Sequence, residues 1–249
     1  MTFAMDWEFK AWRKLRGFRR LAHDPRIYEA RIGETRVSVL LTGMGPRNAS
    51  RAAHTIATEY APDFCIISGL AGGLKERHRP GEILAARTVC SETRAESIQP
   101  EDKLFALATE LGAKPVDRFV SVSRVARTSE EKFALGTFAD AVDMESFTLM
   151  TAIERSGVPA VAIRGVADPA ELTMPYDFER MLHDSGRIRV GNLATQIAQS
   201  PKGLWPLARF GLASLRAAAS LGRYLDGYVT RAGGMQQSLN LTLEQVAQP

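Results

Sequence analysis

Two patterns of apolar and polar positions alternate along the chain. Short apolar runs rich in aliphatic and β-branched residues predict buried strands, and segments with apolar residues three and four positions apart predict helices. The predicted strands cover residues 35–43, 63–69, 81–90, 118–123 and 158–167. The predicted helices cover residues 46–60, 101–112, 130–136 and 145–157. Pro46 suits the first turn of its helix, and Gly112 and Gly157 suit the ends of theirs.

The order of these elements predicts the fold class. Strands and helices alternate, which is typical of an α/β layered domain with a largely parallel sheet. The segment "VPAVAIRGVA" at residues 158–167 is predicted to be a strand buried on both faces.

Composition and charge exclude several classes of protein. With 249 residues, 45% of them hydrophobic and 24% charged, the chain is expected to fold around a substantial core. The formal net charge of +4 is mildly basic. Because no nucleic-acid motif accompanies it, we predict no nucleic-acid partner and keep an anionic membrane surface as a candidate partner. Cys65 and Cys90 have no His or Cys at zinc spacing, so no metal site is predicted.

The chain shows neither a signal-peptide pattern nor an apolar stretch of about 18 residues that could span a bilayer. This predicts a cytoplasmic protein, with a peripheral position on the inner face of the membrane as a further possibility.

Three predicted strands run into unusual motifs. These are "TGMGP" at residues 42–46, "SGLAGGL" at residues 68–74 and "RGVADPAE" at residues 164–171. Ligands of parallel sheets bind where strands end, because the loops there expose backbone and side-chain groups. Neither glycine motif matches a P-loop or a dinucleotide fingerprint, and each one alone is more typical of a tight turn.

Carboxylates stand at both ends of the segment 145–168. Glu145 begins a predicted helix, and Asp168 follows a predicted strand. Taken alone, Glu145 is explained as an acid that the helix dipole favours, and Asp168 as a turn residue before Pro169. A structural and a functional interpretation are therefore both open for each.

Taken in order, five motifs make the chain resemble the nucleoside phosphorylase and nucleosidase superfamily, which includes methylthioadenosine/S-adenosylhomocysteine nucleosidase. They are "FAMDWE", "LLTGMGPRNASRAA", "CIISGLAGGLKERHRPGEIL", "AVDMES" and "VPAVAIRGVADPA", and the resemblance covers residues 3–199. "VDMES" followed by "ADPA" and Pro175 is most similar to the hopanoid-biosynthesis-associated branch, which is linked to removal of adenine from adenosylhopane. The resemblance implies a three-layer α/β/α sandwich with a mixed, mostly parallel central sheet.

The resemblance also implies roles for individual residues. Asp168 matches the family aspartate that delivers a proton toward purine N7, and Glu8 matches the glutamate that activates water. Glu145 matches the glutamate that binds the ribose 2′ and 3′ hydroxyls. Further substrate-binding positions are Met144, Arg164, Gly69, Ala71 and Gly72. Cleavage between purine and ribose passes through a cationic sugar, so separated carboxylates suit the reaction.

Two of these residues have an equally simple structural explanation. Glu8 can be explained as an exposed acid on the first helix, and Arg164 can be explained as the partner of a structural acid.

Two departures from the family bear on the acceptor. Leu70 stands where members usually carry a polar residue, and Ile67 stands where bacterial purine phosphorylases carry an arginine. An apolar wall does not compensate the desolvation of a phosphate dianion. Water is therefore the preferred acceptor and inorganic phosphate the alternative co-substrate, and no cofactor is implied.

Residues 1–200 are predicted to form the catalytic domain, and residues 201–249 a basic amphipathic helix with a flexible tail from Thr230. Arg209, Arg216 and Arg223 lie seven residues apart, which places them on one helical stripe. Near the N-terminus, a run of basic residues at 10–20 is accompanied by apolar side chains, among them Trp12, Leu15 and Phe18. Both segments suit an anionic bilayer, and a C-terminal helix docked on the domain is the alternative.

These observations favour an enzyme that cleaves the N-glycosidic bond of an adenosyl compound and releases adenine, with adenosylhopane, converted to ribosylhopane, as the leading substrate. Methylthioadenosine/S-adenosylhomocysteine-type nucleosidase and purine nucleoside phosphorylase are the enzymatic alternatives. A non-catalytic nucleoside-binding or membrane-associated scaffold is the alternative of another class, although a scaffold has no need of both Glu145 and Asp168. The expected partners are an adenosyl-type or lipid-linked substrate and, as in the family, further copies of the chain in a homo-oligomer.

Overall fold

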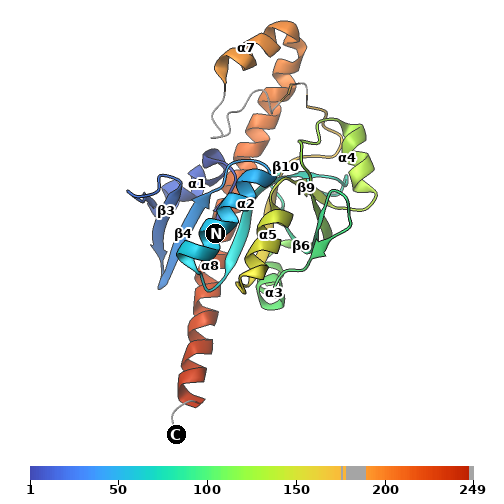
Figure 1. The fold of residues 1–249 in the computed structure, drawn as a ribbon. Helices are drawn as coiled ribbons and strands as arrows, with labels where there is room; N and C mark the ends of the chain where they lie inside the picture. The colour runs from blue at the N-terminus through green and yellow to red at the C-terminus, as the bar shows by residue number, and fades with distance from the viewer. Residues whose placement is uncertain (175, 178–188, 247–249) are drawn as a thin grey trace.

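The computed structural model describes residues 1–174, 176–177 and 189–246. One mixed sheet lies between two layers of helices (Figure 1). Its strands are β1 (Thr2–Phe3), β2 (Arg19–Arg20), β3 (Ile27–Ile32), β4 (Thr35–Leu41), β5 (Cys65–Gly73), β6 (Ile83–Ser91), β7 (Ser97–Ile98), β8 (Lys114–Ser121), β9 (Ala141–Asp143) and β10 (Ala160–Asp168). The helices described are α1 (Asp6–Arg16), α2 (Pro46–Thr55), α3 (Asp102–Glu110), α4 (Ser129–Gly136), α5 (Ser146–Arg155), α7 (Val190–Gln199) and α8 (Leu204–Val246).

The strand order is β10-β6-β8-β9-β5-β1-β4-β3-β2, with β7 beside β6. Because β10 also pairs with β5, the strands β5, β9, β8, β6 and β10 close into a ring, and β1, β4, β3 and β2 extend the sheet from it. The α/β class and the mixed sheet are confirmed. Most of the paired residues lie in parallel ladders, chiefly those of β10 with β5 and of β6 with β8, whereas β3 is antiparallel to both of its neighbours and β10 is antiparallel to β6.

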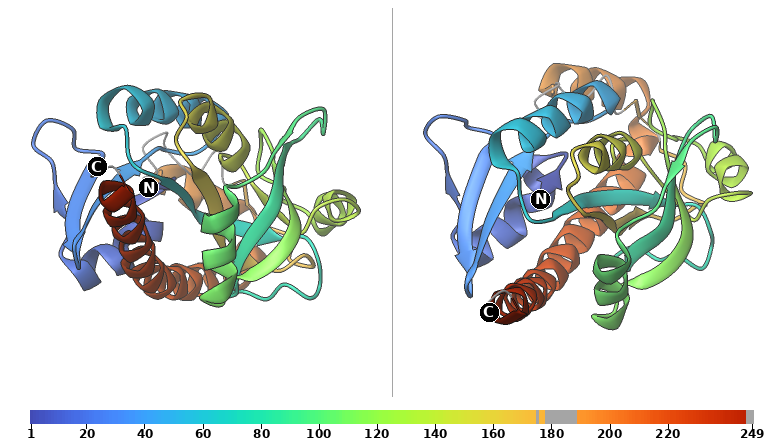
Figure 2. Two further views of the ribbon diagram at one scale, coloured as in Figure 1. Left: turned by 90° about the horizontal axis from the view of Figure 1, so that it is seen from below. Right: turned by 60° about the horizontal axis from the view of Figure 1, so that its bottom comes forward.

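The two helical layers bury separate hydrophobic clusters. On one face, α2 and α5 contribute Ala52, Ala53, Leu149, Met150 and Ile153. On the other face, α1, α3 and α8 contribute Trp12, Leu107, Leu221, Leu225 and Tyr228 (Figure 2). The five strands predicted from apolar runs and the four predicted helices are all present, with shifted ends.

Three differences follow from tertiary pairing. The strand predicted to end at residue 69 continues to Gly73, because β10 pairs with it along its length. The predicted helix 46–60 is α2 followed by a π-helical turn, Ile56–Tyr60. The short strands β1, β2, β7 and β9 and the strand β3 lack apolar runs of their own and were not predicted.

The C-terminal segment differs most from the sequence-based expectation. α8 continues to Val246, so the flexible tail expected from Thr230 is helical as far as that residue. No proline interrupts the sequence between residues 207 and 248, so nothing forces the helix to stop. Leu221, Leu225 and Tyr228 are fully buried against the sheet and α1. The division of the chain at residue 200 stays a prediction.

The N-terminal aromatic residues also differ from the expectation of a membrane contact. Trp12 and Phe18 are buried and pack at 4.9 Å between ring centroids, and only Leu15 of the three is exposed. Trp12 Nε1 donates a hydrogen bond of 3.1 Å to Asp226 of α8, which fixes α1 to the long helix.

Candidate active site

The candidate site is built along the second halves of β5 and β10, which run parallel side by side. Their register sets Arg164 opposite Gly69 and Asp168 opposite Gly72, with an irregularity between Val166 and Asp168. A methyl group on Gly69 would lie 2.5 Å from Arg164 Nη1, and one on Gly72 would lie 3.1 Å from Val142. Gly69 also has a φ of +139°, which side-chain-bearing residues rarely adopt. Gly69 therefore leaves the space that the Arg164 side chain occupies, and Gly72 leaves room for Val142 of β9.

Arg164 is the centre of the site. Its side chain is 1% exposed, and its Nε lies 2.9 Å from Asp143 Oδ2 while its Nη2 lies 3.8 Å from Glu145 Oε2. Nη1 donates to the carbonyl oxygen of Ser68 at 3.1 Å. Arg164 thus pairs with a structural acid, Asp143, and also approaches the predicted substrate-binding carboxylate of Glu145. The structural interpretation and the site interpretation of Arg164 are therefore compatible.

Asp143 organises the loop that carries Glu145. Its Oδ1 accepts hydrogen bonds from the backbone amides of Glu145 and Ser146, at 3.2 and 3.1 Å, and from Ser121 Oγ at 2.6 Å. The carboxylate therefore fixes the entry to α5, where Glu145 stands as the N-cap residue.

Glu145 joins the N-termini of two helices. Its Oε1 accepts a hydrogen bond of 2.8 Å from the backbone amide of Gly45, which precedes the first turn of α2. The helix N-terminus favours a negative charge at this place. The neighbouring Met144 lies with its methyl group 3.8 Å from where a Cβ on Gly45 would be, so this side chain faces the same corner of the site.

Glu8 is a buried residue of α1, not an exposed acid of a first helix. Its Oε1 accepts from the backbone amide of Leu70 at 2.9 Å, and its Oε2 accepts from that of Met5 at 2.8 Å. Both oxygens lie within 3.4 Å of the position of a Cβ on Gly69. The first turn of α1 therefore brings this carboxylate to the same stretch of β5 as Arg164.

Asp168 has a partner that the sequence analysis missed. Lys132 of α4 is 1% exposed and donates to Asp168 Oδ2. The same ammonium donates to the carbonyl oxygens of Pro169 at 3.1 Å and Leu172 at 2.8 Å, which holds the turn after β10. No motif marks Lys132, because it stands in an ordinary helical segment 36 residues away in sequence.

Burial sets the protonation behaviour of the three predicted site carboxyls. Burial raises the pKa of Glu145 to about 7, although Arg164 opposes the rise. It also raises the pKa of Glu8, against the hydrogen bond from Leu70 and the charge of Arg164. For Asp168 burial again raises the pKa, and the Lys132 ammonium opposes it. Groups with raised pKa values in a buried cluster are what proton transfer near neutral pH requires.

The remaining predicted residues are placed less directly. Ala71 is buried in the hydrophobic cluster beneath α2 and α5. Ile67, also in that cluster, is fully buried. Pro175, used above to compare branches of the family, lies outside the described residues.

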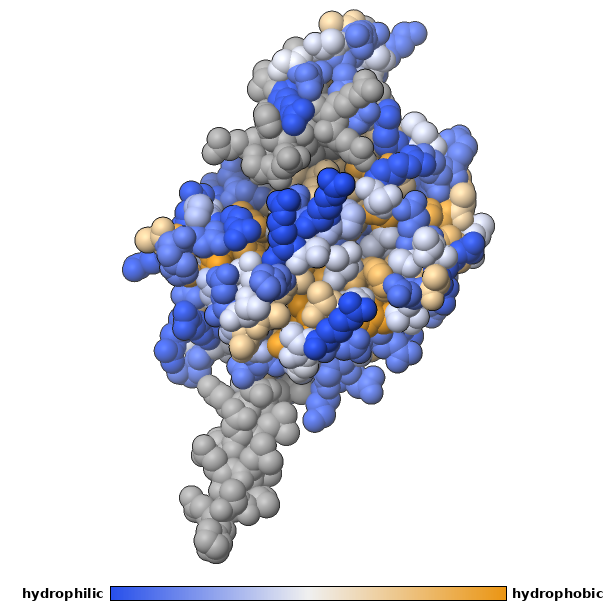
Figure 3. Space-filling view, viewed as in Figure 1, coloured by the Kyte–Doolittle hydropathy of each residue, from blue (hydrophilic) through white to orange (hydrophobic). Residues whose placement is uncertain are grey.

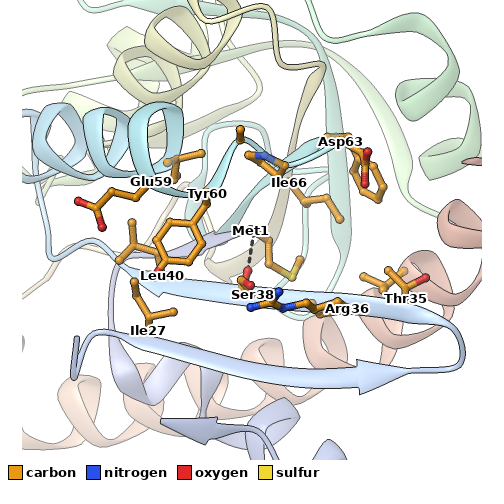
Figure 4. Close-up of a pocket in the computed structure, with 16 residues that line it drawn as sticks. Met1, Ile27, Thr35, Arg36, Ser38, Leu40, Glu59, Tyr60, Asp63 and Ile66 are labelled. Atoms are coloured by element: carbon orange, nitrogen blue, oxygen red, sulfur yellow. Dashed lines mark hydrogen bonds between the residues drawn. The ribbon is translucent and has the colours of Figure 1, made fainter. Parts of the chain in front are cut away.

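A separate cavity of about 390 Å³ lies near the start of β5 (Figure 4). Its walls include Ile27, Ser38, Leu40, Tyr60 and Ile66, and none of the predicted site residues lines it. This cavity is therefore separate from the candidate active site.

Comparison with known proteins agrees with the fold. The chain is 28% identical over 181 residues to the 5′-methylthioadenosine/S-adenosylhomocysteine nucleosidase of Shewanella halifaxensis, which covers 60% of this chain and 76% of the relative. It is 25% identical over 183 residues to the protein of the same name from Haemophilus ducreyi, covering 63% and 78%.

Two solved structures show the same architecture. The 5′-methylthioadenosine/S-adenosylhomocysteine nucleosidase of Neisseria meningitidis gives a TM-score of 0.69 at 20% identity over 92% of this chain and 97% of that one. Futalosine hydrolase of Helicobacter pylori gives a TM-score of 0.70 at 16% identity over 92% and 96%. The sequence model of the phosphorylase superfamily matches residues 2–196, so the chain belongs to that superfamily.

Proposed function

We propose that this protein hydrolyses the N-glycosidic bond of an adenosyl compound and releases adenine. The observation that carries the proposal is the arrangement of buried carboxyls along one strand. Glu8 lies at Gly69 and Leu70, and Asp168 pairs in register with Gly72, three residues or about 10 Å further along β5. An acid and a base held at different places along one strand can act on opposite sides of one glycosidic bond.

In the proposed reaction Asp168 is protonated and gives its proton to N7 of the purine. The bond between C1′ and N9 breaks, its electron pair leaves with the base, and the ribose becomes cationic. Glu145 accepts hydrogen bonds from the 2′ and 3′ hydroxyls and places negative charge near the cation. Water then forms the new bond to C1′ and loses its proton to Glu8.

The charges of the site favour water over phosphate as acceptor. Glu8, Asp143 and Glu145 surround one guanidinium, that of Arg164, which is already paired with Asp143. A phosphate dianion brought to this cluster would meet mainly like charges. A cationic sugar would meet opposite charges.

We further propose adenosylhopane as the substrate. The support is the resemblance of "VDMES", "ADPA" and Pro175 to the hopanoid-associated branch. The relatives named above bear the names of nucleosidases that act on 5′-substituted adenosines, which is consistent with an enzyme of this kind.

The test is adenine release from three substrates at equal concentration: adenosylhopane in vesicles, methylthioadenosine and adenosine. The proposal predicts the highest kcat/KM for adenosylhopane. A higher kcat/KM for methylthioadenosine would instead support the nucleosidase alternative, and absence of adenine from all three would support a non-catalytic scaffold.

A further inference from the structure

We infer that the first part of α8, residues 204–216, is a docking surface for an anionic lipid bilayer. The surface consists of four exposed apolar side chains, Leu204, Trp205, Leu212 and Leu215, together with the exposed Arg209 and Arg216 of the helix and the exposed Lys202 in the turn just before it. It is called the α8 surface below.

The exposure of the apolar residues is unusually high. Trp205 is 76% exposed, Leu212 58%, Leu215 57% and Leu204 51%. Further along the same helix, Leu221 and Leu225 are fully buried. The helix therefore changes partner near Ala217: its second part packs on the protein, and its first part presents apolar groups outward. Large exposed apolar side chains gathered on one element are typical of an interaction site.

The spacing places these residues on one side of the helix. Trp205, Arg209, Leu212 and Arg216 follow one another at intervals of four, three and four residues. Residues at such intervals share a helical face. Apolar groups flanked by long basic side chains are the pattern of helices that lie in the headgroup region, where the apolar groups insert and the cations stay at the phosphates.

The charge of this segment selects an anionic partner. From Val190 to Leu225 the chain contains no acidic residue. In the part of the chain that the structure describes, no carboxylate pairs with Lys202, Arg209 or Arg216. A symmetric contact between two copies through this face would bring the same arginines together, which opposes self-association. An anionic bilayer offers opposite charge and an apolar interior at once.

The α8 surface begins beside the candidate active site. A Cβ on Gly165 of β10 would lie 3.4 Å from the carbonyl oxygen of Ala217 and 3.1 Å from Leu70, whose backbone amide binds Glu8. From Ala217 back to Leu204 the helix rises about 20 Å at 1.5 Å per residue. This part extends past the sheet edge where β10 ends (Figure 1). Docking through it would therefore bring that edge of the sheet toward the lipid.

The face with α2 and α5 offers a matched control. It is mainly hydrophilic, with smaller apolar areas between (Figure 3). Arg51 of α2 and Arg155 of α5 are exposed there, on the side of the sheet opposite α8 (Figure 2). Reversing these two charges changes the net charge by the same amount as reversing Arg209 and Arg216.

The experiment is co-sedimentation of the full chain with vesicles of phosphatidylcholine alone or mixed with an equal part of phosphatidylglycerol. We expect binding to the anionic vesicles that weakens with salt but does not vanish. R209E/R216E should lower the partition coefficient by about thirtyfold or more, since each basic residue near such a surface adds roughly a factor of five. L212S/L215S should lower the binding that remains at high salt, and R51E/R155E should bind like the wild type.

Melting temperature and adenine release from a soluble adenosine are measured for each variant, so that misfolding is recognised. The inference is overturned if the wild type does not bind anionic vesicles, or if R51E/R155E loses as much binding as R209E/R216E. It is also overturned if the wild type is a dimer in solution that L212S/L215S converts to monomers without vesicle binding, because the α8 surface would then be a contact between copies. Vesicle binding is measured without substrate, so its outcome does not depend on the proposed reaction.

Discussion

Asp168 and Lys132 form a buried pair in which burial and charge act in opposite directions. Burial favours the neutral carboxyl, and the ammonium favours the carboxylate. If Asp168 is the proton donor, Asp168→Asn should lower kcat by about two to four orders of magnitude, the usual scale for a positioned acid. Nucleoside binding, measured by calorimetry, should be nearly unchanged. Full turnover in this variant would remove Asp168 from the mechanism.

Lys132 should set the pH range in which Asp168 works. Replacing it by glutamine removes the cation that lowers the pKa of Asp168, so that pKa should rise further. A general acid is active below its pKa, and the alkaline limb of the kcat/KM profile should therefore move to higher pH. The measurement is the pH profile of Lys132→Gln beside that of the wild type, with circular dichroism to verify folding. An unmoved alkaline limb would show that Lys132 only holds the turn at Pro169.

Glu145 should make stability depend on pH. Its pKa is about 7 in the folded protein and near 4.5 in the unfolded chain. Between these values the folded state binds more protons than the unfolded state, so the free energy of unfolding falls as pH rises. The side chain of Glu145→Gln does not titrate, so it contributes no such fall. As pH rises from 4.5 to 7, the free energy of unfolding of this variant should therefore gain up to about 3 kcal/mol relative to that of the wild type.

Urea unfolding of both proteins at pH 5 and pH 8 measures this difference. If the difference in unfolding free energy between the two proteins is the same at both pH values, folding does not raise the pKa of Glu145, contrary to the account.

At the scale of single residues, the ordered sequence motifs identified candidate site residues that composition and periodicity alone could not. The motif match singled out four charged residues. The structure places Arg164 and Asp168 on β10, Glu8 against Leu70 of β5, and Glu145 3.8 Å from Arg164. Lys132 could not be identified from the sequence, because its contact with Asp168 arises only when α4 packs against the end of β10. No spacing rule relates two residues whose proximity depends on a tertiary contact.

At the scale of elements, α8 combines two roles that its sequence does not separate. Its arginine stripe suits an interfacial helix as well as a helix docked on the domain, and in the structure residues 217–232 carry much of the core on one face of the sheet. Tyr228 donates a hydrogen bond of 2.9 Å to the carbonyl oxygen of Leu104, and Tyr224 donates one of 2.7 Å to that of Ala108. An apolar position on an amphipathic helix looks the same whether protein or lipid covers it, so the sequence alone left both alternatives open.

Two leucines on this helix provide a test. Leu221→Ala should lower the free energy of unfolding by about 2–5 kcal/mol, because it removes fully buried methyl groups and leaves a cavity. Leu215→Ala, at a residue 57% exposed, should change it by less than about 0.5 kcal/mol. Chemical denaturation of both variants checks the pair. Similar losses would mean that the first part of α8 is packed in solution and not free for a membrane.

The strands show a similar limit of local pattern. β4, β5, β6, β8 and β10 have apolar runs and were predicted, whereas β3 mixes apolar and charged residues in "IYEARI" and was not. β1 has only two residues, Thr2 and Phe3, and exists because β4 and β5 pair with it. Elements that depend on partners distant in sequence carry little signal of their own.

At the scale of the whole molecule, the site is placed by the layers. α1 supplies Glu8 from one face of the sheet, and the N-termini of α2 and α5 supply Gly45 and Glu145 from the other. β10 joins both through Arg164. Among the helices that the structure describes, none has the length and apolar character that a membrane span requires.

The central claim is hydrolysis without phosphate, and product analysis in phosphate-free buffer tests it most directly. The protein is incubated with a 5′-substituted adenosine, and adenine and the sugar product are quantified with and without added phosphate. The account predicts equal amounts of adenine and free reducing sugar, at a rate that phosphate does not increase. Adenine release that requires phosphate and yields a sugar 1-phosphate, or no adenine release at all, would contradict it.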